Sequence, residues 1–314
     1  MVQHEFPSEE TYKGSSGRLG AARRGLRPAR PGAATIAAMP APTPDLPCPA
    51  IDLPAQPEAL FKLSLLMADA DIDLKAAAAL IETDMALAAA VMKAVNAALF
   101  GLKGRVQSVL QAVQYLGLRE VAAVTYEIGL RSVFPPTPEL EPIWQRAARR
   151  GQVMGRLGQR LGVDGWAAHS AGLFEECGKA LLLRHAPAHY PAMLRAAPDD
   201  TALVQLEQTG FGVRHDVLGA SLCQSWGLAA MAVASVRHHL AARDGAPLPG
   251  GLTEPAVLAL SVLAHAMLGG ADVAAVLARL APQVPLDEGL ALRAVRDVQR
   301  QLDDAVPAPG PPGA

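Results

Sequence analysis

The sequence has few aromatic residues, and this shortage restricts the kind of core it can form. Phe, Trp and Tyr together make up 4% of the 314 residues, although apolar residues make up 51%. The interior must therefore be built mainly from Ala, Leu and Val, and this composition favours helices. We find no convincing alternation of apolar and polar residues, so no sheet is predicted. The expected fold class is all-α.

Cysteine occurs at only three positions, Cys48, Cys177 and Cys223, and no two of them form a CxxC motif. An odd number and wide spacing argue against a disulfide framework and against a thiolate zinc site. A reducing cytoplasm is therefore the expected location. Cys177 precedes Gly178 in an apolar stretch, so we predict a small buried side chain there, with the glycine allowing a neighbouring helix to approach closely.

The chain also lacks a charge excess and a long apolar run. Its formal net charge is -2, which gives no reason to expect a nucleic acid or an anionic membrane surface as a partner. The longest apolar run, AVLALSVLAHAMLGGA from Ala256, is shorter than the roughly 20 residues that span a bilayer. No secretory signal is visible, and no P-loop, GxSxG or HExxH motif is present. Neither nucleic acid nor membrane is a predicted partner.

Composition changes divide the chain into four parts. Residues 1–49 mix Gly, Ser, Pro and Arg without hydrophobic periodicity and are predicted to be a disordered extension, with a basic interaction arm as the alternative. Translation from Met39 instead of Met1 would remove most of it. The segment FPPTPELEP, residues 134–142, separates a helical module at 50–135 from a second module at 136–305. Residues 306–314 are predicted to be a tail.

Local signals place helices in both modules. Asp84 is a predicted N-cap, Ser108 with Gln111 resembles a capping box, and Gly117 suits a left-handed position after a helix end. Further helices are predicted over residues 119–133, 142–162, 166–185, 187–197, 201–209, 215–226, 229–241 and 254–267, with the last turns between 271 and 304.

Two groups of motifs resemble the HDOD family, a bacterial relative of the HD phosphohydrolases. The first is residues 53–121, which contain a Leu-Pro start, VNAALFG and SVLQAVQYLGL; the second contains AGLFEECGKALLL, FGVRHDVLGASLCQSWGL and VRHHL. Together they cover most of residues 50–270, and their order and spacing make the resemblance fairly specific. It implies a helical bundle of two modules, the second a degenerate HD-like module.

The resemblance also shows where the sequence departs from the HD pattern. The His-Asp pair that names the family aligns with Glu175 and Glu176, an upstream helix histidine aligns near Arg146, and a late aspartate aligns near His265. HD hydrolases need several His and carboxylate ligands around one or two cations that lower the pKa of bound water. A guanidinium carries a permanent charge and is no ligand. We therefore predict no metal, no cofactor and no standard HD site.

The two glutamates also have ordinary structural interpretations. Glu175 precedes Lys179 by four residues, the favourable order for a helical ion pair contributing about 0.2 to 0.5 kcal/mol. Glu176 is either exposed or paired with Arg146. In the second case Glu176→Arg should destabilise the fold, and Arg146→Glu should restore it.

Three histidines resemble additional metal ligands of the HD-GYP relatives that hydrolyse cyclic dinucleotides. His215 precedes Asp216 at a helix start, where an N-terminal capping role is the simpler interpretation. His238 and His239 are adjacent, so a helix points them about 100° apart and at most one need face the core. A site rebuilt from these histidines, His265 and the glutamates is the alternative hypothesis.

The resemblance implies a regulatory protein without catalytic activity. We expect a cytoplasmic signal-transduction module that binds a protein partner through the groove between the modules, or a nucleotide as a sensor. The alternative is a metal-dependent phosphohydrolase acting on a cyclic dinucleotide. The relic pocket is predicted to comprise Arg146, Glu175, Glu176, Lys179, His215, His238, His239 and His265.

Overall fold

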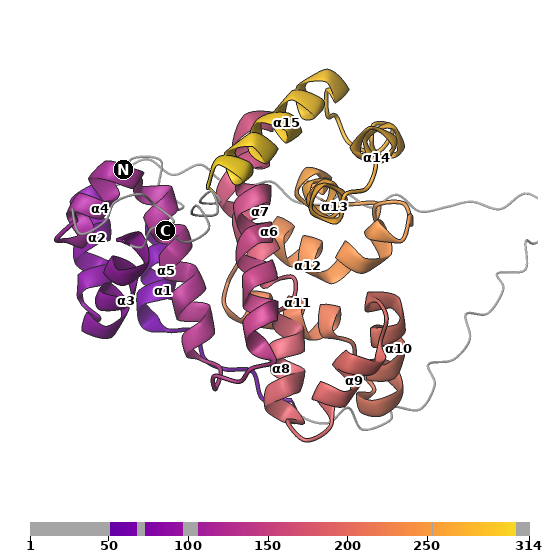
Figure 1. Cartoon of the computed structure of the whole chain (residues 1–314), viewed down its shortest axis with the longest axis horizontal. Helices are drawn as coiled ribbons and strands as arrows, with labels where there is room; N and C mark the ends of the chain where they lie inside the picture. The colour runs from indigo at the N-terminus through magenta and orange to yellow at the C-terminus, as the bar shows by residue number, and fades with distance from the viewer. Residues whose placement is uncertain (1–50, 68–72, 97–105, 253, 306–314) are drawn as a thin grey trace, which may run out of the picture. The chain divides into compact units, whose positions relative to one another are not determined.

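The computed structural model describes residues 51–67, 73–96, 106–252 and 254–305 (Figure 1). All regular secondary structure in these ranges is helical, which confirms the predicted all-α class. No helix within them combines the length and apolar character needed to cross a membrane. The predicted extension at 1–49, which includes Cys48 and Met39, and the tail at 306–314 lie outside the described residues.

The first module forms from short amphipathic helices. They are α1 (Glu58–Met67), α2 (Leu74–Glu82), α3 (Met85–Val95), α4 (Val109–Leu116) and α5 (Leu118–Ser132). Asp84 caps α3 as predicted, because its Oδ1 accepts from the backbone N–H groups of Ala86 and Leu87, each at 3.0 Å. Gly117 ends α4 with a φ of 88°, which only glycine adopts without strain.

The capping box at α4 is only half formed. Ser108 Oγ accepts from the backbone N–H of Gln111 at 3.2 Å, as expected for the N-cap. The Gln111 side chain does not return to Ser108, because its Oε1 accepts instead from the Gln107 N–H at 2.8 Å. The start of α4 was therefore predicted correctly, as was the Ser108 bond, whereas the predicted bond from Gln111 back to Ser108 is not formed.

The second module begins with a long helix and continues through nine more. They are α6 (Leu140–Leu161), α7 (Gly165–Phe174), α8 (Cys177–His185), α9 (Tyr190–Ala196), α10 (Asp200–Phe211), α11 (His215–Ser225), α12 (Ala230–Arg243), α13 (Pro255–Gly269), α14 (Val273–Leu280) and α15 (Glu288–Ala305). Most predicted ranges match these helices to within a few residues. The exception is the predicted helix over 166–185, which the structure divides into α7 and α8.

The break between α7 and α8 lies at Glu175 and Glu176. Glu176 has φ -99° and ψ 2°, outside the α-helical geometry. Immediately after the break, Gly178 lies against the backbone of His215, and a Cβ at this glycine would lie 1.8 Å from the His215 carbonyl oxygen. This contact and the full burial of Cys177 confirm the predicted close helix approach. The break itself arises from packing between distant segments, which helical periodicity does not report.

Two hydrophobic cores hold the helices together. The first contains Leu60 and Tyr126 from the first module together with Phe174 and Leu181 from the second. The second core lies among α6, α7 and α12 to α15. Because one core includes residues on both sides of the predicted boundary at 135/136, the two modules pack as neighbours in a single unit.

Candidate functional site

A cluster of buried charges occupies the turn between α7 and α8. Glu175 is fully buried and Glu176 is 3% exposed. Ionised carboxylates are almost never buried to this degree unless cations or metal ions pair with them. The identity of these partners therefore decides what the site can do.

Glu176 is paired with three cationic side chains. Its Oε2 accepts from Arg146 Nη2 at 2.6 Å, and its Oε1 accepts from Arg150 Nη1 at 2.9 Å. Lys179 Nζ lies 3.5 Å from the same Oε2. Burial alone would raise the pKa of Glu176, but the positive charges of Lys179, Arg146 and Arg150 outweigh burial and hold this pKa well below its usual range. The predicted contact between Glu176 and Arg146 is confirmed.

Glu175 is paired with two guanidinium groups and not with Lys179. Arg150 Nε lies 3.2 Å from Glu175 Oε2, and Arg243 Nη2 hydrogen bonds to the same oxygen. Lys179 Nζ instead donates to Asp200 Oδ1 at 2.7 Å. The predicted helical pair of Glu175 with Lys179 was wrong, because the helix is broken between them and the four-residue spacing no longer places both on one face.

His215 and His239 lie beside this cluster, with ring centroids 6.0 Å apart. His215 is fully buried, and its Nδ1 lies 2.8 Å from Glu207 Oε2. The capping interpretation of His215 was wrong, since Arg214 occupies the N-cap and the backbone N–H of His215 donates to Glu207 Oε2 at 2.8 Å. Glu207 also accepts from the Tyr190 hydroxyl, which explains how this carboxylate is accommodated at full burial.

The remaining histidines separate as the sequence suggested. His239 is buried and the adjacent His238 is only half-buried, in agreement with their predicted divergence on one helix. Burial, together with the charges of Arg243 and His215, lowers the pKa of His239 well below its ordinary value. His265 is exposed on α13 and makes no hydrogen bond to the charged cluster within the described residues. Burial, together with the charges of Arg243 and Arg150, lowers the pKa of His265, so these two arginines of the cluster still act on it through their charges.

Comparison with protein families identifies the family to which the chain belongs. The model of the HDOD domain matches residues 53–242, which is more than half of the chain. The chain belongs to the HDOD family. The HDOD match ends within α12, so α13 to α15 extend beyond it.

Known proteins share this HDOD fold at low sequence identity. An uncharacterized protein of Treponema pallidum (strain Nichols) is 29% identical over 196 residues, which are 60% of this chain and 37% of that protein. The chain thus spans little more than a third of that relative. A Marinobacter aquaeolei VT8 structure, provisionally assigned to signal transduction, has a TM-score of 0.65 and 21% identity, covering 81% of this chain and 58% of that one. A Shewanella amazonensis SB2B structure, provisionally described as a phosphohydrolase, has a TM-score of 0.61 and 19% identity, covering 80% and 95%.

The side chains around Glu175 and Glu176 do not fit a metal ion. Both Glu176 oxygens and Glu175 Oε2 are engaged by cationic groups, so a metal ion would have to displace them and lie beside their charges. Across the described part of the chain, no three His, Cys, Asp or Glu side chains converge in a way that would hold a metal ion. Several buried atoms in or near the cluster have no hydrogen-bond partner among the described residues: Arg150 Nε and Arg243 Nε, and the possible metal-ligating atoms Glu175 Oε1, His215 Nε2 and His239 Nε2.

Three functional-site residues were missed by the sequence reasoning. Arg150 follows Arg146 by four residues, and Arg243 follows His239 by four. Residues four apart share one face of a helix, so this spacing was the signal that places each arginine toward the same interior. Glu207 had no comparable signal, because its contact with His215 depends on how α10 packs.

Proposed function

We propose that this HDOD protein is a non-catalytic signalling module of the cytoplasm that acts by binding a protein partner. The observation that carries the proposal is the pairing of Glu175 and Glu176 with Arg146, Arg150 and Arg243. By the resemblance to the HD hydrolases, these guanidinium groups lie near positions where such an enzyme would require metal cations and neutral ligands.

The chemistry of the cluster supports a structural role for it. Hydrolysis of a phosphodiester at such a site needs bound water with a lowered pKa and a cation that neutralises phosphate charge. An arginine can contact a phosphate, but it does not coordinate water, and its own pKa is far too high for it to act as a base. The buried ion pairs therefore fix the geometry of the turn between α7 and α8 without supplying a nucleophile.

The surface best placed for a partner is a hollow formed by α3, α5, α6 and the segment that precedes α6. It has a volume of about 790 Å³, within the range of about 300 to 1,000 Å³ that is usual for binding sites. Apolar side chains such as Val124, Ile128 and Phe134 line it together with Lys93 and Arg131. An apolar floor with charged edges suits a segment of another protein.

The experiment is affinity purification of the tagged chain from its native host, in parallel with two variants. Ala94 lines the hollow, so Ala94→Trp should fill it and remove the partner, whereas Ala89 is exposed on the same helix and does not line it. Ala89→Trp should keep the partner. Retention of every specific partner by Ala94→Trp would contradict the proposed surface.

A metal-dependent phosphohydrolase is the second candidate function. Glu175 Oε1, His215 Nε2 and His239 Nε2 favour it, since each lacks a partner in the described part of the chain and is an atom type that ligates metals. Metal analysis of the purified protein and a phosphodiesterase screen with cyclic dinucleotides and added Mn²⁺, Mg²⁺ or Fe²⁺ separate the two functions. Our proposal predicts no stoichiometric metal and no turnover. Turnover that disappears in His239→Ala would establish the enzyme instead.

A further inference from the structure

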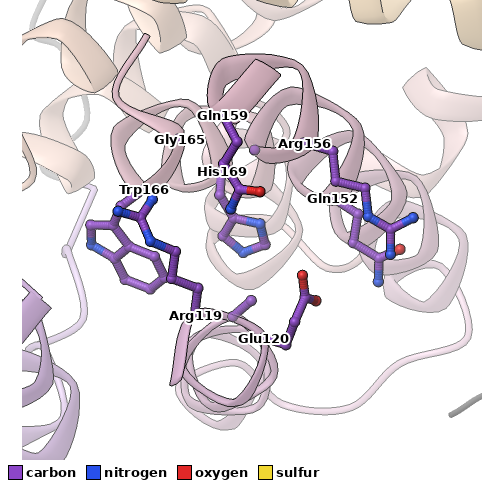
Figure 2. A pocket seen from close by; sticks show the side chains of 10 residues that line it. Arg119, Glu120, Gln152, Arg156, Gln159, Gly165, Trp166 and His169 are labelled. Atoms are coloured by element: carbon purple, nitrogen blue, oxygen red, sulfur yellow. The ribbon is translucent and has the colours of Figure 1, made fainter. Parts of the chain in front are cut away.

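A small cavity lies between α5, α6 and α7, on residues that the charged cluster does not use. It has a volume of about 30 Å³. Its lining includes Arg119, Glu120, Gln152, Arg156, Trp166 and His169. Figure 2 shows the His169 imidazole pointing into the space between Glu120 of α5 and Gln152 of α6. A space of this size holds one water molecule or one small polar group of a larger ligand.

His169 is the unexplained feature of this cavity. It is 8% exposed, and its Nε2 has no hydrogen-bond partner within the described residues, although the backbone of Gly151 bonds to the ring. The ring stacks on Trp166 with centroids 5.8 Å apart and an interplanar angle of 13°, which fixes its direction. Burial lowers the pKa of His169 to about 4, so the imidazole is neutral at pH 7. Since a hydroxyl both donates and accepts, it can pair with Nε2 in either tautomer.

The cavity adjoins a wider hollow on the same helices. Glu120, Arg156 and Gln159 line both spaces, and the outer one, of about 440 Å³, also includes Arg160 and Gln301 from α15. The outer hollow is large enough for a metabolite, while the inner cavity accepts only a single group from it. A ligand that used both spaces would place its larger part in the outer hollow and one small polar group at His169.

The charges around the two spaces select the ligand. Arg119, Arg156 and Arg160 contribute three positive charges and Glu120 one negative charge, and none of the arginines forms an ion pair with another described residue. A phosphate ester carries about -1.5 to -2 at pH 7 and can pair with both Arg156 and Arg160 of the outer hollow, whereas a single carboxylate carries only one charge. Guanidinium groups also bind phosphate oxygens in a bidentate manner.

We propose that these two spaces form a binding site for a hydroxyl-bearing phosphate ester, with the phosphate at Arg156 and Arg160 in the outer hollow and one hydroxyl at His169 in the inner cavity. A sugar phosphate and a mononucleotide both carry this chemistry. The site goes beyond the proposed function, because it gives the module a small-molecule input beside its protein-binding surface, and Gln152 lines both.

Isothermal titration calorimetry of the full chain tests this site with ribose 5-phosphate, AMP and inorganic phosphate. We expect at least one of the two esters to bind, and inorganic phosphate to bind at least tenfold more weakly because it cannot also place a sugar hydroxyl at His169. Binding of both esters assigns recognition to the sugar phosphate, and binding of AMP alone assigns it to a nucleotide. Absence of ester binding, or equal affinity for inorganic phosphate, would overturn the proposal.

Three variants locate the binding. Arg156→Gln should raise the Kd about tenfold or more, because one charge-assisted hydrogen bond to phosphate is lost. His169→Phe keeps a ring against Trp166 and removes Nε2, so it should abolish the preference for esters over inorganic phosphate. Arg195→Gln changes an exposed arginine on α9 outside both spaces and should leave the Kd unchanged. If Arg156→Gln binds the esters as tightly as Arg195→Gln does, the proposed ligand site is wrong. The assay contains no protein partner, so this outcome is independent of the proposed protein-binding function.

Discussion

Replacing Glu176 by glutamine should destabilise the fold far more than the small change in side-chain shape suggests. The substitution preserves the shape of the side chain but leaves Arg150 and Lys179, which are 7% and 4% exposed, with one carboxylate fewer between them. Removing one partner of a buried ion pair costs about 3 to 5 kcal/mol, because the remaining charge stays buried without full compensation. That is a large part of the roughly 5 to 15 kcal/mol that stabilises a typical domain.

Arg146→Gln breaks a bond of the same carboxylate from the other side and provides the matched comparison. The Arg146 side chain is 50% exposed, so water can solvate what the substitution leaves behind. Glu176 also keeps its bonds to Arg150 and Lys179. The expected cost is therefore that of a surface ion pair, about 0.2 to 1 kcal/mol.

Urea denaturation followed by circular dichroism gives both free energies of unfolding by linear extrapolation. The structure predicts a difference of at least about 2 kcal/mol between Glu176→Gln and Arg146→Gln. Equal costs for the two variants would refute the claim that burial decides the strength of this cluster. The same geometry revises the charge swap, because Arg150 and Lys179 would still repel an arginine at position 176, so Arg146→Glu should not rescue Glu176→Arg.

Two further predictions concern other buried positions. The pKa of His169 falls from an ordinary 6.5 to about 4 in the fold, so below pH 6.5 the unfolded chain binds a proton that the folded chain does not. The free energy of unfolding should decrease by roughly 3 kcal/mol from this residue between pH 6.5 and 4, and His169→Phe should remove that part of the slope in urea titrations at each pH. Gly178→Ala places a Cβ 1.8 Å from the His215 carbonyl oxygen and should cost about 3 kcal/mol or more. A Cβ at Gly250 would meet no atom of the described residues within 4 Å apart from its chain neighbours, so Gly250→Ala should change the melting temperature little.

The features that sequence predicted well are those set by local chemistry. Asp84 and Gly117 act on backbone groups within a few residues, so their roles follow from residue type and position alone. The resemblance to the HDOD family then supplied the arrangement of the modules and the position of the two glutamates. Local pattern and family motif together determined most of the fold.

The features that sequence did not predict depend on contacts between distant segments. The break at Glu175 and Glu176 accompanies the packing of Gly178 on His215, 37 residues later in the chain, and no helical periodicity reports such a contact. Once the helix is broken, Lys179 pairs with Asp200 instead of Glu175. The burial of Glu207 likewise depends on Tyr190 and His215 meeting in space.

The core that crosses residue 135 limits how this chain can be taken apart. Tyr126 of α5 packs edge-on against Trp166 of α7 at 5.0 Å, and Trp226 Nε1 donates to the Pro54 carbonyl at 2.9 Å. Cutting the chain at the proline-rich segment would uncover apolar surface on both pieces, even though the composition there resembles a linker. The two halves are therefore not interchangeable cassettes, and chimeras that recombine HDOD proteins at this point would join mismatched interiors.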